Sequence, residues 1–95
     1  MTIEHAIAKR HILAFDYDGF HRTVEPHTYG IDRKGHRALR AYQTGGGSDS
    51  GEIVGWKLFH EHDMHSMRDT GQSFAGPRPD YRRGDRAFQQ ILAEL

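Results

Sequence analysis

The stretch "HILAFDYDGFHRTVEPHTYGI", residues 11–31, decides the fold that this sequence predicts. Apolar and β-branched residues stand on both sides of Asp18-Gly19, a dipeptide that tolerates positive φ and is typical of hairpin turns. The pattern predicts two antiparallel strands, over residues 11–17 and 20–31. Pro26 has no N–H to give to a sheet, so we expect the second strand to be irregular at that position.

Strand character continues beyond this hairpin. The turn "DRKG", residues 32–35, leads into the alternating run "HRALRAYQ", which predicts a strand over residues 36–44. "IVGWKLF" is the most apolar short run of the chain and predicts a strand over residues 53–60, and another is expected over residues 63–68. Short antiparallel strands with tight turns favour a mainly β (α+β) fold built on a small five-stranded SH3/Sm-like barrel.

A helix is expected on each side of these strands. Thr2 suits an N-cap and is followed by apolar residues at helical spacing, which predicts a short helix over residues 3–9. Near the other end, four apolar residues follow Asp85 at i, i+3, i+4 and i+7, which predicts an amphipathic helix over residues 85–94. These four are Phe88, Ile91, Leu92 and Leu95.

The segment before that second helix, residues 71–84, is rich in glycine and proline and is expected to be a loop that Phe74 and Tyr81 pin to the rest of the molecule. Ninety-five residues is about the size of one small domain, so residues 1–95 are expected to form a single domain with a thin core.

Composition excludes several classes of function. Thirteen lysines and arginines balance thirteen aspartates and glutamates, so no global field marks a general nucleic-acid or membrane binder, and any basic site must be local. The absence of cysteine excludes disulfides, a thiol nucleophile and a thiolate metal site. No apolar run approaches the roughly 18 residues of a membrane span. We therefore expect a soluble, cytoplasmic protein with no membrane partner.

The glycine-rich segment "GGGSDSGEIVGW", residues 45–56, invites comparison with a phosphate-binding loop. Such a loop leads from a strand into a helix that begins with Lys-Ser/Thr, whereas this segment leads into a predicted strand and carries Asp49 and Glu52 where a cation is needed. Two interpretations remain: a flexible connection between strands, or a loop that orders over a ligand.

Eight histidines raise the question of a metal site, most sharply in "HEHDMH", residues 60–65. His60 and His62 would share one face of a strand, but residues at i and i+2 supply only two ligands, and zinc needs three or four. The remaining histidines, His36 among them, are too scattered to pair by spacing. No serine lies in a nucleophile elbow, and Asp18 is explained by its turn. We therefore expect no metal, no cofactor and no enzymatic activity.

The remaining candidates are cations interleaved with aromatic residues. Arginine offers bidentate hydrogen bonds to phosphate, and aromatic faces stack on bases, which is how small barrels hold single-stranded nucleic acid. The expected ligand-binding residues are Arg22, Arg40, Tyr42, Lys57 and Arg78. The alternative is that the aromatic residues belong to the core and the arginines pair with carboxylates such as Glu25.

Several motifs in the chain resemble the WYL domain, an Sm-like barrel of prokaryotic transcription regulators. The likeness covers roughly residues 3–70 and is strongest to small stand-alone members with "VEPH.YG", "LRAYQ.GG", "GWKLF" and "F.GPRP.Y", which begin here at Val24, Leu39, Gly55 and Phe74. Of the Trp-Tyr-Leu triplet that names the family, this chain carries Leu39, preceded by Arg37 and Ala38.

The resemblance implies a module that senses a ligand or nucleic acid, with Arg22, Arg40 and Lys57 at the matching basic positions. We expect it to bind single-stranded nucleic acid or a nucleotide in transcription regulation. The alternative is an accessory module that docks a protein partner or a second copy of itself, through an exposed strand edge or the loop from Phe74 to Tyr81. Arg40 and Arg78 buried in ion pairs, with an apolar patch outside, would favour this alternative.

Overall fold

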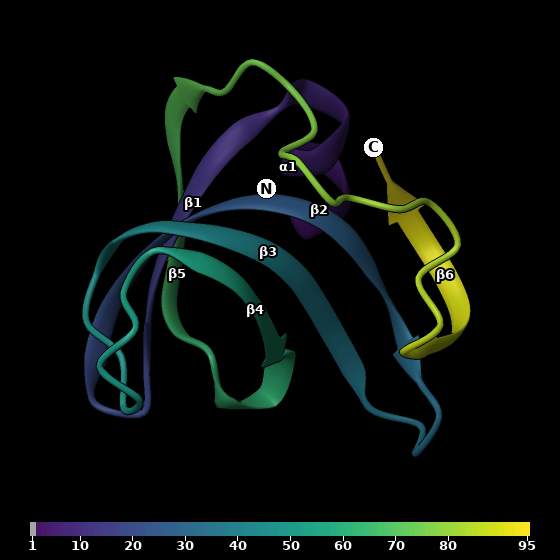
Figure 1. The fold of residues 1–95 in the computed structure, drawn as a ribbon, viewed down its shortest axis with the longest axis horizontal. Coiled ribbons are helices and arrows are strands. Elements are labelled where there is room, and N and C mark those ends of the chain that lie inside the picture. Colours follow the sequence, from purple (N-terminus) through teal and green to yellow (C-terminus); the bar gives the residue numbers. More distant parts are fainter. Residues whose placement is uncertain (1) are drawn as a thin grey trace.

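A computed structural model describes residues 2–95 and shows a mainly β protein with one short α-helix (Figure 1). The elements are α1 (Ile3–Lys9), β1 (His11–Tyr17), β2 (Phe20–Asp32), β3 (Arg37–Gly46), β4 (Gly55–His60), the 3₁₀ helix η1 (Glu61–Asp63), β5 (His65–Ser73) and β6 (Phe88–Glu94). The predicted hairpin is confirmed: β1 and β2 pair antiparallel around the Asp18-Gly19 turn, where both residues have positive φ.

All six strands belong to one antiparallel sheet, in which five follow the order β4-β3-β2-β1-β5 and β6 pairs with β2. The long strand β2 pairs with β3 along one edge. On its other edge, its first half pairs with β1, up to Val24, and its second half pairs with β6, from Thr28 onward. Pro26 lies between these two partners, beside a shift in the register with β3. The expected irregularity is confirmed, because the missing N–H falls where neither β1 nor β6 needs it.

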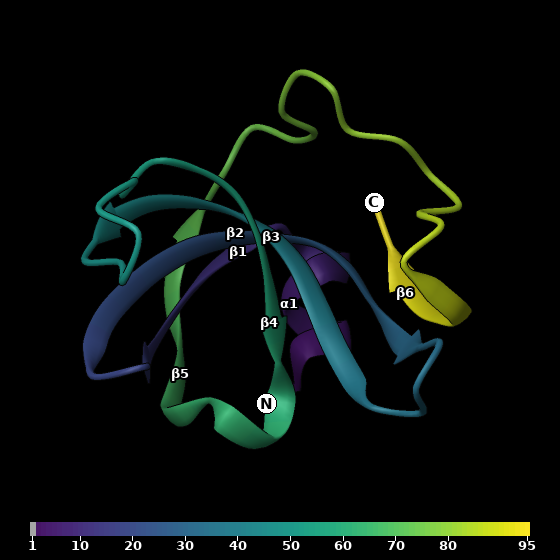
Figure 2. The same ribbon diagram turned by 60° about the horizontal axis from the view of Figure 1, so that its bottom comes forward.

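The sheet is strongly curved but open, since β4 and β5 are joined through η1 and do not pair with each other (Figure 2). Strands β3, β4 and β5 occupy approximately the predicted ranges, with β5 extending to Ser73. The loop that follows therefore runs from Phe74 to Ala87. No helix in residues 2–95 is long and apolar enough to cross a membrane.

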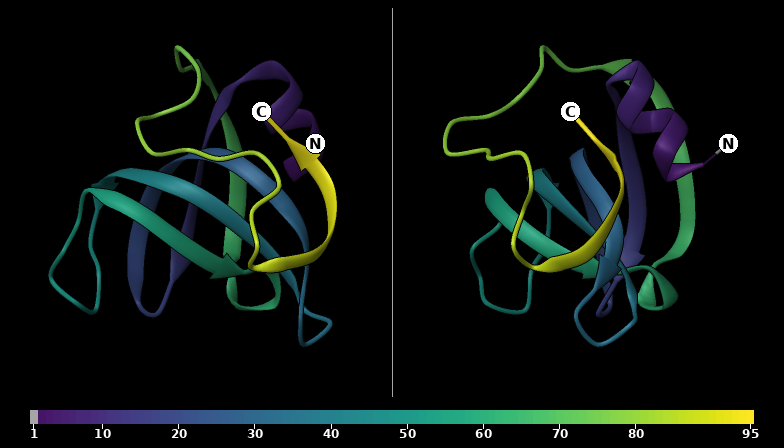
Figure 3. Two further views of the ribbon diagram at one scale, coloured as in Figure 1. Left: turned by 45° about the vertical axis from the view of Figure 1, so that its right-hand side comes forward. Right: turned by 90° about the vertical axis from the view of Figure 1, so that its right-hand side faces the viewer.

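Helix α1 begins and ends with specific caps. The Thr2 hydroxyl accepts a hydrogen bond from the His5 N–H at 3.0 Å, as the sequence predicts, and Arg10 ends the helix in the left-handed conformation. The helix buries Ile3, Ala6 and Ile7 against the concave side of the sheet, beside β6 (Figure 3). A seven-residue helix is too short to be stable alone, so this packing holds it in place.

The prediction of a C-terminal helix over residues 85–94 is wrong. Phe88–Glu94 form strand β6, and the N–H of Leu95 continues the contact by donating to the His27 carbonyl at 3.0 Å. Only Phe88 of the four apolar residues is fully buried, so the helical spacing did not describe one buried face. The second half of β2 offers a row of backbone groups beyond the end of β1, and pairing with β6 satisfies them. That tertiary pairing outweighs the local helical pattern.

Candidate anion-binding site

The chain returns from β5 to β6 through a long loop that crosses above the convex, outer face of the sheet (Figure 2; Figure 3 gives further views). Between this loop and the outer face of β3 and β4 lies an open cleft of about 860 Å³. The residues that line it are Arg40, Trp56, Asp80, Tyr81, Arg82, Arg83, Gly84, Asp85 and Arg86. Four arginines thus face two aspartates in one concave surface.

Arg40 reaches the cleft from β3 and is fixed there by Asp85. Its Nε donates to Asp85 Oδ2 at 2.8 Å, while Asp85 Oδ1 accepts the Ala87 N–H at 2.9 Å. Burial alone would raise the pKa of Asp85, but the hydrogen bonds from Arg40 and Ala87 outweigh it, and the pKa is lowered. Within residues 2–95 the two Nη groups of Arg40 have no protein acceptor. The Asp85 carboxylate therefore orients the Arg40 guanidinium and leaves the N–H groups of its two Nη atoms to donate to a ligand.

The other arginines of the cleft differ in their partners. Arg83 lies 3.2 Å from a Glu94 oxygen, in an exposed ion pair. Arg82 and Arg86 are exposed and have no carboxylate at ion-pair distance among the described residues. The cleft thus keeps a local excess of positive charge in a chain whose formal net charge is zero.

Aromatic rings form one wall of the cleft. Trp56 projects from β4, stacks on Tyr81 with 6.2 Å between ring centroids, and donates from Nε1 to the Pro79 carbonyl at 3.2 Å. Tyr81 in turn bonds through its hydroxyl to the Leu95 carbonyl at 3.3 Å. Phe74 is buried, so both residues that the sequence predicts to pin the loop do so.

Arg78 and Tyr42, two predicted ligand-binding residues, contact each other and are not among the residues that line the cleft. Arg78 makes two hydrogen bonds to the buried Glu25 carboxylate, at 2.7 and 3.0 Å, and its guanidinium lies 4.6 Å from the centre of the Tyr42 ring. This bidentate pair raises the pKa of Arg78, mainly through the hydrogen bonds to Glu25. The pair attaches the loop to β2 and covers one face of Tyr42.

Arg22 and Lys57, the other two predicted ligand-binding residues, do not line the cleft. Arg22 is 4% exposed and donates to Gln43 Oε1 and to the Tyr17 carbonyl, both at 3.2 Å. Lys57 lies opposite Ala41 in the β3–β4 ladder and so projects to the other face of the sheet from Arg40. Its amino group donates to the Glu52 carbonyl in the glycine-rich loop. Of the predicted set, the fold brings only Arg40 to the cleft wall.

Sequence reasoning missed Arg82, Arg83 and Arg86, which stand in a segment expected to be loop and helix. The signal that could have found them is the density of cations in "YRRGDR", residues 81–86, next to an aromatic residue. Comparison with models of known protein families, with curated proteins and with solved structures found no match.

His27 lies beneath the cleft and joins the loop to the sheet. Its ring is fully buried, Nδ1 donates to the Glu25 carbonyl at 2.8 Å, and Nε2 accepts the Arg78 N–H at 3.1 Å. Trp56, Tyr81 and Phe74 surround it at ring-centroid distances of 4.7, 5.0 and 5.8 Å. An imidazole that accepts from one side and donates from the other must be neutral.

Burial accordingly lowers the pKa of His27 below its ordinary 6.5, against a smaller opposing contribution from Glu25. As the pH falls, the His27 imidazole is therefore protonated in the unfolded chain before it is protonated in the folded protein. The contribution of His27 to stability is complete above pH 6.5 and declines as the pH falls below it. We expect the difference in free energy of unfolding between the wild type and His27→Gln to shrink on acidification, by at most about 1.4 kcal/mol per pH unit.

Urea unfolding of both proteins between about pH 7.5 and about pH 5 measures this difference, and the other histidines cancel in the comparison. The lowered pKa values of Asp32, Asp69 and Asp85 affect stability only below their ordinary 3.8, in a separate range. A titration midpoint of the His27 ring at or above 6.5 by NMR would contradict the assignment.

Proposed function

We propose that this chain is a non-enzymatic, WYL-like ligand-binding module that holds single-stranded nucleic acid or a nucleotide in its arginine-lined cleft. The observation that carries the proposal is the Arg40 guanidinium, which Asp85 holds through Nε while both Nη groups have no acceptor within residues 2–95. A fixed fork of this kind suits a phosphate group. Trp56 and Tyr81 beside it offer aromatic surface to a base.

The strand arrangement supports the resemblance on which the family proposal rests. Five antiparallel strands in the order β4-β3-β2-β1-β5, with a short helix before the first, suit an Sm-type barrel that β6 extends along β2. The segments "VEPH" and "GPRP" meet through the Glu25–Arg78 pair and the Arg78–His27 hydrogen bond. A role in transcription regulation follows from the resemblance alone.

Fluorescence anisotropy of labelled single-stranded DNA and RNA at low salt tests the proposal. We expect Arg40→Ala and Arg86→Ala each to weaken binding by about tenfold or more, because a hydrogen bond to a charged group contributes about 1.5–3 kcal/mol. Each substitution should also make the slope of log K against log salt concentration shallower, by the amount that corresponds to about one phosphate contact. Arg40→Lys keeps the charge but loses the fork, so it should recover only part of the affinity.

Arg68→Ala is the matched control for the loss of one positive charge. Arg68 is exposed on β5, outside the cleft, and its guanidinium donates to the Ser66 carbonyl at 3.1 Å. We expect this variant to bind as the wild type does. The proposal is wrong if no nucleic acid or nucleotide binds at low salt, or if Arg68→Ala weakens binding as much as Arg40→Ala does.

A module that docks a protein partner is a second candidate function. Arg40 and Arg78 both form ion pairs with carboxylates, which is one of the two features that favour it. The aromatic residues of the loop, Phe74 and Tyr81, pack against His27, which leaves the edge of the sheet at β4 as the docking element. Leu58 is exposed on that strand, and Ile53 and Val54 are exposed just before it. An edge with apolar side chains is suited to strand addition by a partner or a second copy.

Sedimentation of the wild type and Leu58→Lys over a range of concentrations tests the version with a second copy. We expect the wild type to associate and the lysine variant to remain a monomer, since a charge on an edge strand opposes pairing. A wild type that is monomeric at every concentration contradicts self-association through β4.

A further inference from the structure

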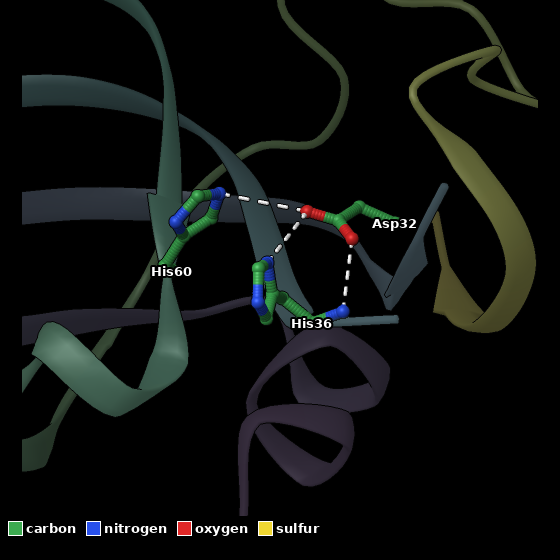
Figure 4. Close-up of side chains that lie close together, drawn as sticks. All are labelled: Asp32, His36 and His60. Carbon is green, nitrogen blue, oxygen red and sulfur yellow. Dashed lines mark hydrogen bonds and ion pairs between the residues drawn. The ribbon is translucent and has the colours of Figure 1, made fainter. Parts of the chain in front are cut away.

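Three histidines and one aspartate, from two segments that are distant in sequence, meet at one end of the sheet. Asp32 ends β2, His36 closes the turn before β3, and His60 ends β4, as Figure 4 shows for these three side chains. His62 follows in η1, with its ring centroid 5.6 Å from that of His36 and 5.8 Å from that of His60. The β3–β4 pairing of Ala38 with His60 sets this arrangement, because it places the end of β4 beside the β2–β3 turn.

The donor atoms of the three side chains have the spacing of a metal site. Asp32 Oδ2 lies 3.5 Å from His60 Nε2 and 3.7 Å from His36 Nδ1, and the three donor atoms all lie within 4.8 Å of one another. With bond lengths of about 2.0–2.1 Å and tetrahedral angles, ligand atoms around zinc are about 3.3 Å apart. Small side-chain rotations would therefore bring all three donors into one coordination sphere.

The carboxylate of Asp32 is oriented as a metal ligand requires. Its Oδ1 accepts the N–H groups of Lys34 and His36, both at 2.9 Å, and its side chain is 12% exposed. Gly35, at φ +86°, closes this turn. With Oδ1 held by the backbone, Oδ2 is left facing the two imidazoles. Hydrogen bonds that fix the second oxygen of a carboxylate ligand are typical of metal sites.

The two arginines that flank the cluster in sequence, Arg33 and Arg37, are directed elsewhere. Arg33 Nε donates to the Arg86 carbonyl at 2.9 Å, and Arg37 Nη1 donates to the Tyr29 hydroxyl at 3.3 Å. The side chains of His36 and His60 are 47% and 38% exposed, so an ion from solvent can reach their nitrogens.

We propose that Asp32, His36 and His60 bind a divalent transition-metal ion, with His62 or water completing the coordination. Two imidazoles and one carboxylate suit Zn²⁺ and its neighbours in the first transition row, whereas Mg²⁺ and Ca²⁺ prefer oxygen ligands. The ion would join the β2–β3 turn to the end of β4, in addition to the β3–β4 ladder and the Asp32–His60 contact.

Calorimetry and thermal unfolding of the full chain, without an affinity tag and freed of metal by a chelator, test this site with Zn²⁺. We expect one equivalent to bind and the melting temperature to rise by about 10 °C at a free-ion concentration of one hundred times Kd. Mg²⁺ should produce neither effect. Co²⁺ should give the visible absorption of a bound ion.

Single substitutions identify the ligands. His36→Ala and His60→Ala should each weaken Zn²⁺ binding by about a hundredfold or more, since even outer-shell partners contribute about 10- to 100-fold. Asp32→Asn, which keeps an oxygen acceptor for the turn, should also weaken it. Melting of each variant without metal shows whether it remains folded, and replacing His36, on an exposed turn, should affect folding least.

His21→Ala is the matched control, since His21 is exposed on β2 and lies 3.4 Å from Asp16, outside the cluster. It should bind Zn²⁺ as the wild type does. The proposal is overturned if the wild type binds no Zn²⁺, or if folded His36→Ala and His60→Ala proteins bind it with unchanged affinity. It is also overturned if His21→Ala weakens binding equally, because Zn²⁺ would then bind to histidines scattered over the surface.

Discussion

Replacing Gly30 by alanine is expected to destabilise the protein by about 3 kcal/mol, or about 15 °C in melting temperature. A Cβ atom at this position would collide with the Gln90 carbonyl oxygen and lie 3.1 Å from both Ile91 Cα and Phe88 Cδ1. Two of these three atoms belong to the backbone of β6 and cannot rotate away. Strand β6 would have to move from β2, exposing the backbone groups that now pair with it.

Thermal unfolding measures the loss, and amide hydrogen exchange locates it. The N–H of Leu95, bonded to the His27 carbonyl, should exchange faster in the variant relative to the amides that pair β1 with β2. Gly45→Ala is the matched control, because a Cβ there meets only the Thr23 Cβ at 4.0 Å. If Gly30→Ala melts within about 2 °C of the wild type, the close approach of β6 to β2 is not as described.

Replacing Gln43 by leucine is expected to cost about 3 kcal/mol, because it removes three hydrogen bonds of a fully buried side chain at once. The Gln43 amide donates to the carbonyls of Gly45 and Gly47, both at 2.9 Å, and its oxygen accepts from Arg22. Arg22 already has one buried donor, Nε, without a partner within residues 2–95. Loss of the Gln43 oxygen would leave the Arg22 guanidinium with the Tyr17 carbonyl as its one hydrogen-bond acceptor among the described residues.

Urea unfolding of a double-mutant cycle separates this cause from simple packing loss. Arg22→Met in the Gln43→Leu background should cost much less than Arg22→Met in the wild type, since removing both partners leaves neither member of the Arg22–Gln43 pair buried without the other. Gln72→Leu, on an exposed position of β5, is the control and should change stability by about 0.5 kcal/mol or less. Additive costs for Arg22→Met and Gln43→Leu would contradict the coupling.

The strands could be predicted because their signals are local. Asp18-Gly19 and the alternation around it specify the β1–β2 hairpin without reference to the rest of the chain. The C-terminal segment shows the limit of such signals. Four apolar residues at helical spacing describe a helix, but the free edge of β2 that captures β6 lies about 60 residues earlier in the sequence, and no local pattern reports it.

The partners of charged side chains were beyond sequence reasoning for the same reason. Arg40 is paired with a carboxylate 45 residues away, and Arg78 with one 53 residues away. Charge composition showed that a basic site must be local, but only the fold decides which arginines are neutralised. His36 and His60 likewise become neighbours only through the β3–β4 ladder.

The stacking of Trp56 on Tyr81 has a practical consequence. Trp56 is the single tryptophan of the chain, so fluorescence excited at wavelengths that tyrosine does not absorb originates entirely from the wall of the cleft. A base that stacks there, or a displacement of the loop that breaks the hydrogen bond to Pro79, would change the emission of one defined chromophore. The unlabelled protein therefore carries its own optical probe, with which small unlabelled nucleotides can be screened directly.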